Sequence, residues 1–420
     1  MQTFNLRETA MIMRNKTTYA LTTALLLGIC ITAISINAAD WPGFLGPNRD
    51  GHSPDKGLIK SWGSDGPPLL WKVSNIGPGW SSMSIVNGYV YTTGNSGDNQ
   101  MVICLDLKGK EKWRVAQGPI APNRGYPGAR STPTVDGKLL YVTGGAGAVT
   151  CHSSATGKII WKREMRSDMG GRVGGWKYAE SVLILGNLAI VTPGGGNAIV
   201  ALNKLTGKTV WKSDASGTAG YSSCIPITIG GSTIICNGSQ SGLMFVDAKT
   251  GKELGRSKFA APNTANCPTP AYSNGYLFWA VGYGKGSVCL KVTKSGSRWS
   301  FKEAWRNRDF NCHPGNYVVV DGKVYGKGRR GLTCADLKSG ETLWQERVSS
   351  GQVAFADGML YVQADRGGKV TLVDPSASSD RAKGSFSVAG RGASWSHPVI
   401  IDGKLFVRYD TNLYCYNVKK

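Results

Sequence analysis

Aromatic and polar side chains recur along the sequence at intervals of about 40 to 50 residues, each shortly before an apolar run. Aromatic rings can stack on a planar or sugar-like ligand, and polar groups beside them can fix its orientation. The recurring residues are Trp80, Arg130, Tyr178, Glu180, Tyr221, Asn266, Asn311, His313, Gln352, Trp395 and His397. We expect them to converge on one ligand-binding pocket. The competing interpretation is that they cap strand starts and line a wet channel.

Four of the side chains near these positions are metal-ligating types, namely Cys267, Cys312, His313 and His397. Thiolate and imidazole groups suit zinc or copper. Their spacing matches no compact metal motif, so we predict no metal and keep these four as weak candidates. A disulfide between Cys267 and Cys312 is an alternative.

A repeated eleven-residue frame indicates how such distant residues are brought together. In the copy from Ala201 to Trp211, an apolar run leads into Asn203, a Thr-Gly turn follows, and a β-branched run ends on Trp. The Asn side chain can bond to the turn backbone, and Gly207 supplies a positive φ. The other copies are Cys151–Trp161, Cys334–Trp344, the looser Cys104–Trp113, and Phe245–Gly255 with Gly in place of Trp.

A second type of turn separates the first two apolar runs of each repeat. Asn-Gly and Asp-Gly pairs between apolar runs are strong hairpin signals. Eight two-residue turns occur: Asn-Gly or Asp-Gly at residues 87–88, 136–137, 274–275, 321–322, 357–358 and 402–403, Gly-Asn at 186–187 and Gly-Gly at 230–231. Four strands per repeat and eight repeats predict an all-β, eight-bladed propeller with four antiparallel strands per blade.

The last repeat has room for only three strands before the chain ends at Lys420. The apolar run Leu69–Val73 has no repeat before it. We therefore expect this N-terminal strand to join the last blade and close the ring. An open stack or solenoid is the alternative.

The residues before this strand divide into two parts. Basic residues and an apolar run in residues 1–39 end at small residues, as in a signal peptide, so we expect export to the periplasm or the outside of the cell. An uncleaved membrane anchor is the alternative; after cleavage we expect no transmembrane span. Residues 40–68 form an irregular leader rich in Gly and Pro, and residues 69–420 form the propeller domain.

The frame from Ala201 to Trp211 resembles the tryptophan-docking repeat of PQQ-type propellers, a family that includes quinoprotein alcohol dehydrogenases and BamB-type outer-membrane assembly propellers. The opening Trp41-Pro42 and Gly46-Pro47-Asn48-Arg49-Asp50-Gly51 is similar to that of many secreted bacterial PQQ-like propellers. The resemblance implies a docking role between blades for Trp71, Trp113, Trp161, Trp211 and Trp344. Cysteines at the Ala position of the frame are then small buried residues under a Trp.

The quinoprotein dehydrogenases of this family need Ca²⁺ beside the quinone and a carboxylate base. Calcium takes several oxygen ligands, generally with more than one carboxylate. The predicted mouth of the central channel, where the recurring residues converge, has one clear carboxylate, Glu180, among cations such as Arg130 and Arg391. We therefore predict no cofactor and disfavour PQQ with calcium. A PQQ-dependent alcohol or sugar dehydrogenase remains the alternative function.

The formal charge of +22 favours anionic partners. The main hypothesis is an exported, non-catalytic binding or scaffold propeller, monomeric, whose partner is an envelope protein or an acidic polysaccharide. Export makes nucleic acid an unsuitable partner.

Overall fold

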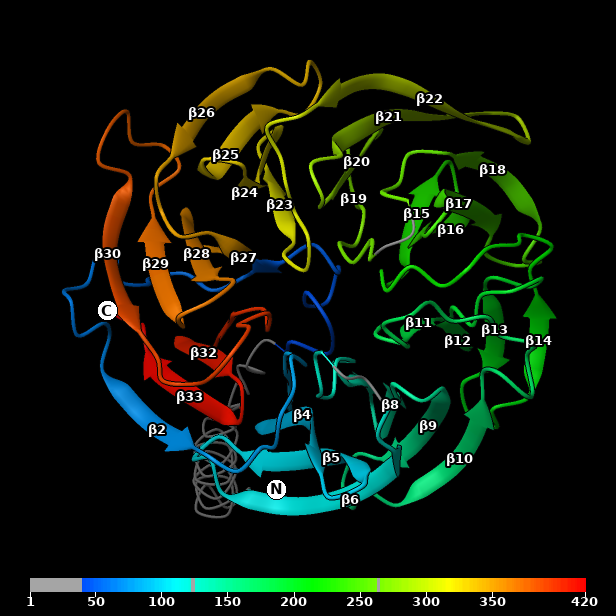
Figure 1. Ribbon diagram of the computed structural model, residues 1–420, viewed down its shortest axis with the longest axis horizontal. Coiled ribbons are helices and arrows are strands. Elements are labelled where there is room, and N and C mark those ends of the chain that lie inside the picture. The colour runs from blue at the N-terminus through cyan, green and yellow to red at the C-terminus, as the bar shows by residue number, and fades with distance from the viewer. Residues whose placement is uncertain (1–39, 122–124, 263–264) are drawn as a thin grey trace, which may run out of the picture. The chain divides into compact units, whose positions relative to one another are not determined.

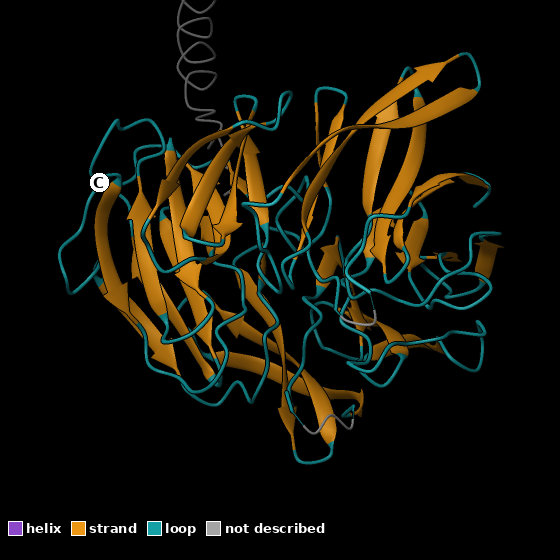
Figure 2. Ribbon diagram, turned by 45° about the horizontal axis from the view of Figure 1, so that its top comes forward, coloured by secondary structure: helices purple, strands orange, loops and turns teal. Residues whose placement is uncertain are grey.

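Each sequence repeat folds into one four-stranded sheet, and eight such sheets stand around a common axis (Figure 1). The structure is a computed structural model, and it describes residues 40–121, 125–262 and 265–420. Residues 1–39, on which the predicted signal peptide falls, lie outside the described residues. Among the described residues no helix occurs (Figure 2), and so none is long and apolar enough to cross a membrane.

The blades follow the order of the chain. Blade 1 contains β3 (Ser84–Val86), β4 (Tyr89–Ser96), β5 (Asn99–Asp106) and β6 (Glu111–Pro119). Blade 2 contains β7 (Thr134–Asp136), β8 (Leu139–Thr143), β9 (Ala148–Ser153) and β10 (Ile159–Glu164). Blade 3 contains β11 (Leu183–Leu185), β12 (Leu188–Val191), β13 (Val200–Asn203) and β14 (Thr209–Lys212). Blade 4 contains β15 (Ile225–Ile229), β16 (Ser232–Ser239), β17 (Gly242–Asp247) and β18 (Glu253–Ser257).

The second half of the ring repeats this order. Blade 5 contains β19 (Ala271–Ser273), β20 (Tyr276–Val281), β21 (Gly286–Ser295) and β22 (Arg298–Asn307). Blade 6 contains β23 (Tyr317–Val320), β24 (Lys323–Gly328), β25 (Gly331–Asp336) and β26 (Thr342–Glu346). Blade 7 contains β27 (Gly351–Ala356), β28 (Met359–Ala364), β29 (Lys369–Val373) and β30 (Ala382–Ser387). Blade 8 contains β31 (Val399–Ile401), β32 (Lys404–Tyr409), β33 (Asn412–Asn417) and the N-terminal β2 (Leu69–Val73).

The ring closes as predicted, because β2 pairs antiparallel with β33 and places Trp71 opposite Cys415. A side chain strengthens this closure. Arg408 of β32 is fully buried. Its guanidinium donates to Thr92 Oγ1 of blade 1 at 3.0 Å and to the carbonyl of Gly77, which precedes blade 1, at 3.0 Å. The last and first blades are thus joined by hydrogen bonds from one side chain.

Docking tryptophans link successive blades. The Trp211 indole donates to the Ala248 carbonyl of the next blade at 3.2 Å, and a Cβ at Gly251 would lie 2.5 Å from its ring. Equivalent indole bonds to the next blade are made by Trp71, Trp113, Trp161 and Trp305. Trp344 instead lies under Arg381, whose guanidinium carbon is 4.6 Å from the ring centre.

Trp305 is a docking residue that the sequence analysis missed. It lies opposite Cys289, the Ala position of its blade, but the long β21–β22 hairpin displaces it along the sequence. The five cysteines at this position, Cys104, Cys151, Cys289, Cys334 and Cys415, are buried free thiols, as expected of small core residues.

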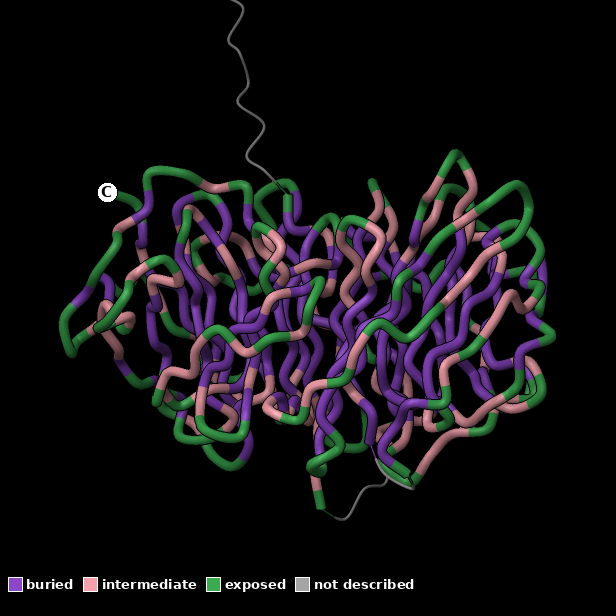
Figure 3. The backbone as a smooth tube through the Cα atoms, turned by 90° about the horizontal axis from the view of Figure 1, so that it is seen from above, coloured by how far each residue is buried: buried purple, intermediate pink, exposed green. Residues whose placement is uncertain are grey.

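Two blades carry Gly where the frame has Trp, and each space is filled by an aromatic ring from elsewhere. Phe301 of blade 5 stacks on Phe245 of blade 4 at 3.8 Å, where a Cβ at Gly255 would lie 2.6 Å from its ring. Trp62 of the leader lies against Gly384 of blade 7. The core of the ring is continuous in consequence, and Figure 3 shows buried backbone through its centre with exposed loops at both faces.

The leader crosses the axis. Arg49 donates to the carbonyls of Ser181 and Val182 beside blade 3, at 2.8 Å and 3.0 Å. Just after it, β1 (His52–Ser53) pairs parallel with β27 of blade 7, on the opposite side of an eight-bladed ring. Figure 1 shows this dark blue segment across the centre of the ring. The leader therefore blocks the axis and adds a fifth strand to blade 7, which was not expected from the sequence.

Candidate functional site

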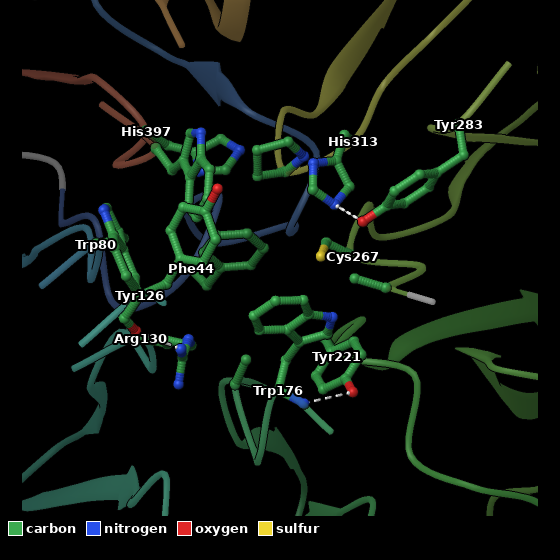
Figure 4. Close-up of a pocket in the computed structure, with 14 residues that line it drawn as sticks. Phe44, Trp80, Tyr126, Arg130, Trp176, Tyr221, Cys267, Tyr283, His313 and His397 are labelled. Atoms are coloured by element: carbon green, nitrogen blue, oxygen red, sulfur yellow. Dashed lines mark hydrogen bonds between the residues drawn. The ribbon is translucent and has the colours of Figure 1, made fainter. Parts of the chain in front are cut away.

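A cavity of about 340 Å³ opens on the propeller axis, and aromatic rings form most of its wall (Figure 4). Its lining residues come from the segments before the innermost strands, from the leader and, for Tyr283, from the β20–β21 loop. They are Phe44, Trp80, Tyr126, Arg130, Trp176, Ala179, Tyr221, Ala265, Cys267, Tyr283, His313, Pro314, Trp395 and His397. A volume of this size is typical of a pocket for one small ligand.

Radial geometry explains why these residues converge. The segment that leads into each innermost strand begins next to the axis, so residues one blade apart in sequence become neighbours in space. Trp80 and Trp395, separated by the whole ring in sequence, have ring centres 5.0 Å apart. Tyr126 lies 5.1 Å from Trp395 and 5.6 Å from Trp176, ring centre to ring centre, so the wall is a continuous aromatic surface.

Arg130 carries the only formal charge among the described lining residues. Its guanidinium carbon lies 5.2 Å from the centre of the Trp80 ring, and its Nη2 donates to the Tyr126 carbonyl at 2.8 Å. Burial lowers the pKa of Arg130, but an arginine stays protonated in ordinary buffers. The pocket therefore presents one positive charge held against an aromatic ring.

The two pocket histidines are neutral at physiological pH. Burial lowers the pKa of His397 to about 3, and burial also lowers that of His313. His313 Nε2 shares a hydrogen bond of 2.6 Å with the Tyr283 hydroxyl, seen in Figure 4. His397 packs edge-on against Phe44, with ring centres 4.9 Å apart, and its buried Nε2 has no hydrogen-bond partner among the described residues. A buried polar atom without a partner is costly to stability.

The structure brings together six of the eleven residues singled out from the sequence. Those that line the pocket are Trp80, Arg130, Tyr221, His313, Trp395 and His397. Tyr178, Glu180, Asn266, Asn311 and Gln352 do not line it. Each of these five instead bonds within the protein: for example, Tyr178 donates to the Pro193 carbonyl, Asn266 bonds to the Ala261 backbone, and Gln352 donates to Asp365.

Glu180 is buried beside the pocket wall and points to a backbone group. Its Oε1 accepts from the Thr192 amide at 2.7 Å, and its other oxygen bonds to the Thr192 hydroxyl. Burial raises the pKa of Glu180 to about 7, against the opposing effects of these hydrogen bonds and of Arg49. The one carboxylate predicted for the channel mouth therefore bonds to Thr192 and does not line the pocket.

Phe44, Tyr126, Trp176 and Tyr283 are pocket residues that the sequence analysis missed. Tyr126 and Trp176 lie in the Gly-rich links a few residues before the segments that were singled out. Tyr283 lies in the β20–β21 loop, and Phe44 lies in the leader, outside every repeat. For Tyr126 and Trp176, an aromatic residue within a Gly-rich link was the available sequence signal of a place in the pocket.

The metal-ligating types do not form a cluster. Cys267, His313 and His397 line the pocket, whereas Cys312 is fully buried and its Sγ donates to the Lys327 carbonyl. Both cysteines are free thiols, so the alternative of a disulfide between them is wrong. The described residues contain no group of three or more His, Cys, Asp or Glu side chains able to hold a metal.

Calcium with PQQ does not fit this pocket. The described lining contains no Asp, Glu, Asn or Gln side chain, while Ca²⁺ takes six to eight oxygen ligands, usually including carboxylates. A quinone bound beside Arg130 would lack both the metal and a carboxylate base.

A family model described as outer membrane protein assembly factor BamB matches residues 98–346 of the sequence. No curated protein matches the sequence of this chain. Among solved structures, BamB from Moraxella catarrhalis superposes with a TM-score of 0.62 at 14% identity, over 84% of this chain and 97% of that one.

Two dehydrogenases share the fold equally well. The quinohemoprotein alcohol dehydrogenase from Comamonas testosteroni has a TM-score of 0.62 at 12% identity, over 93% of this chain and 82% of that one. The quinohemoprotein alcohol dehydrogenase ADHIIG from Pseudomonas putida HK5 has a TM-score of 0.60 at 12% identity, over 91% and 80%. At such identities these similarities establish the propeller fold and leave the activity open.

Proposed function

Because this chain belongs to the family described as outer membrane protein assembly factor BamB, we propose that it is an exported, non-catalytic propeller that acts as a binding module of the cell envelope. The axial pocket is its ligand site. The observation that carries the proposal is the composition of that pocket, which combines aromatic rings with one cation and, among the described lining residues, no carboxylate.

The ligand is a small molecule of one or two rings that carries an acidic group, and a short acidic sugar fits best. Sugar rings stack on aromatic faces such as Trp80 and Trp395. Arg130 supplies a charge-assisted bond to a carboxylate. Cys267, whose pKa burial raises to about 12, stays a neutral thiol and adds no negative charge that would oppose an anion.

Tryptophan fluorescence tests this proposal, because Trp80, Trp176 and Trp395 surround the ligand. Digalacturonic acid is titrated into the purified protein, and the neutral disaccharide lactose serves as the control ligand. We expect saturable quenching by the acidic sugar alone, and its loss in Trp395→Ala. Trp299→Ala, which removes an indole remote from the pocket, should quench as the wild type does. Absence of saturable quenching in the wild type would overturn the acidic-sugar proposal.

A protein partner is the second candidate, favoured by the description of the matching family. If the propeller supports outer-membrane protein assembly, deletion of its gene lowers the amounts of outer-membrane proteins. Complementation with the wild type and with Trp395→Ala then separates the two candidates: rescue by both assigns the scaffold role to surfaces outside the pocket.

Alcohol oxidation is the alternative that the pocket supports least. Reconstitution with PQQ and Ca²⁺, followed by a dye-linked alcohol oxidation assay, is the direct test. We expect no turnover above a protein-free control, because the described lining offers no carboxylate for the metal or for proton abstraction.

A further inference from the structure

The hairpin of β21 and β22 has two faces of opposite character. Its strands are ten residues each, and Figure 1 shows them running past β19 and β20 toward the blade of β18. Side chains directly opposite each other on paired strands share a face, and successive residues alternate. The cross-strand pairs Lys291 with Lys302, Thr293 with Ser300, and Ser295 with Arg298 therefore lie on one face.

This basic face consists of three cations and three hydroxyls, with no carboxylate and no apolar side chain. Its residues are Lys291, Thr293, Ser295, Arg298, Ser300 and Lys302, of which all but the half-buried Ser300 are exposed. Lys291, Thr293, Ser300 and Lys302 line a common hollow of about 330 Å³. The cations extend along the face over about 13 Å, at roughly 3.3 Å per residue.

The cations of the basic face have no ion-pair partner among the described residues. Elsewhere on the same strand, Arg306 pairs with Glu303 at 2.8 Å. Glu303 lies opposite Leu290, on the other face of the hairpin. Two lysines placed directly opposite each other repel and destabilise the strand pair. A polyanion lying across the face would remove that repulsion.

The other face of the hairpin fixes its orientation. Val292 is buried, and Phe301 stacks on Phe245 of blade 4 at 3.8 Å. The basic face therefore points away from blade 4 into solvent. The tip, Ser295 to Arg298, contains no large apolar side chain that would insert into a membrane.

We propose that the basic face of the β21–β22 hairpin binds an anionic polysaccharide, at a site separate from the axial pocket. Lys291, Arg298 and Lys302 pair with carboxylate or sulfate groups along the polymer. Thr293, Ser295 and Ser300 hydrogen bond to its hydroxyls. The extended row of charges suits a linear polymer better than a single small anion.

Binding to heparin, measured at low and at physiological ionic strength, tests the proposal. The variant Lys291→Gln/Arg298→Gln/Lys302→Gln removes the three charges. Its matched control, Lys108→Gln/Lys110→Gln/Lys112→Gln, removes three exposed cations that make no ion pair in the described structure. We expect the hairpin variant to lose about tenfold in affinity and the control less than about twofold. The conservative Lys291→Arg/Lys302→Arg should bind as the wild type does.

Four further measurements make the result decisive. Thermal unfolding and near-ultraviolet circular dichroism show whether each variant is folded. The double variant Arg130→Ala/Trp395→Ala should keep its heparin affinity, so that failure of the pocket proposal and failure of this one are distinguishable. Equal losses in the hairpin and control variants would overturn the proposal, as would binding to phosphatidylglycerol vesicles without binding to heparin.

Discussion

The guanidinium of Arg130 lies over the face of Trp80, with its central carbon 5.2 Å from the ring centre. The two residues come from the segments that precede β7 and β3, so this contact joins blade 2 to blade 1 at the axis. The Trp80 indole holds the Arg130 guanidinium in place but, unlike a carboxylate, does not neutralise its charge. The pocket thereby keeps a positioned charge for a ligand.

Arg130→Gln should weaken digalacturonic acid binding by about tenfold or more, because it removes a charge-assisted hydrogen bond. Arg130→Lys should lose less, since it keeps the charge but not the planar fork. Isothermal titration at constant pH measures both. Equal affinity in all three proteins would show that Arg130 does not contact the ligand.

Glu180 should make stability fall as the pH rises through neutrality. Its pKa is raised from 4.5 to about 7 by burial, so between these values the folded protein binds more protons than the unfolded chain. Glu180→Gln cannot ionise, so its stability relative to wild type should improve from pH 5 to pH 8, by on the order of 2 kcal/mol. Denaturant unfolding at several pH values measures this. Glu341→Gln, at an exposed position, should track the wild type, and a pH-independent difference for Glu180→Gln would contradict the prediction.

The stability cost of a steric clash with a docking tryptophan can be separated from the cost of backbone strain at a turn glycine. Gly207 and Gly137 both have positive φ, 69° and 58°, but a Cβ at Gly207 would lie 2.8 Å from the Trp161 ring, whereas one at Gly137 would meet no atom within 4 Å. Gly137→Ala should cost about 1 kcal/mol from strain alone. Gly207→Ala should cost about 1 to 3 kcal/mol more, because the ring must move. Urea unfolding of both variants measures the two losses in free energy of unfolding. Equal losses would show that the added Cβ does not displace the Trp161 indole.

Arg408 should be essential to the closure between the last and first blades. Burial lowers its pKa to about 9, yet its guanidinium bonds to Thr92 and to backbone carbonyls. Arg408→Leu leaves those acceptors buried without a donor, at a cost of about 2 to 4 kcal/mol. Amide hydrogen exchange should show faster opening of β4 and β32 than of blades 3 to 5.

The exposed Arg306 is the control for that experiment. It pairs with Glu303 at the surface, so Arg306→Leu should change stability by at most about 0.5 kcal/mol. Uniform acceleration of exchange around the ring in Arg408→Leu would argue against a role specific to closure.

Most of the fold could be predicted from the sequence because it depends on local signals. Asn203 Oδ1 accepts from the amides of Leu205 and Thr206, and Gly207 has positive φ, both as the frame indicates. Strands and turns are decided within a few residues, so the eight hairpin turns predict eight blades. The closing strand Leu69–Val73 could be predicted by counting strands.

The pocket could be predicted only in part, because the identity of its lining residues depends on the angles between blades and on the paths of the loops. Alternating residues of one segment point to opposite sides, so Ala179 lines the cavity while the neighbouring Tyr178 and Glu180 turn into the blades. Phe44 lies far from every repeat in the sequence, and only the path of the leader across the axis brings it to the wall.

By itself, the sequence determined the number of blades, the turn residues and the strand that closes the ring, since periodicity and turn chemistry are local. Only the tertiary structure decided which side chains face the axis, that Glu180 is committed to Thr192, and that three cations share one face of the β21–β22 hairpin. Those outcomes depend on register, burial and the packing of residues distant in sequence. Such packing is set by the folded chain as a whole, and no short stretch of residues encodes it.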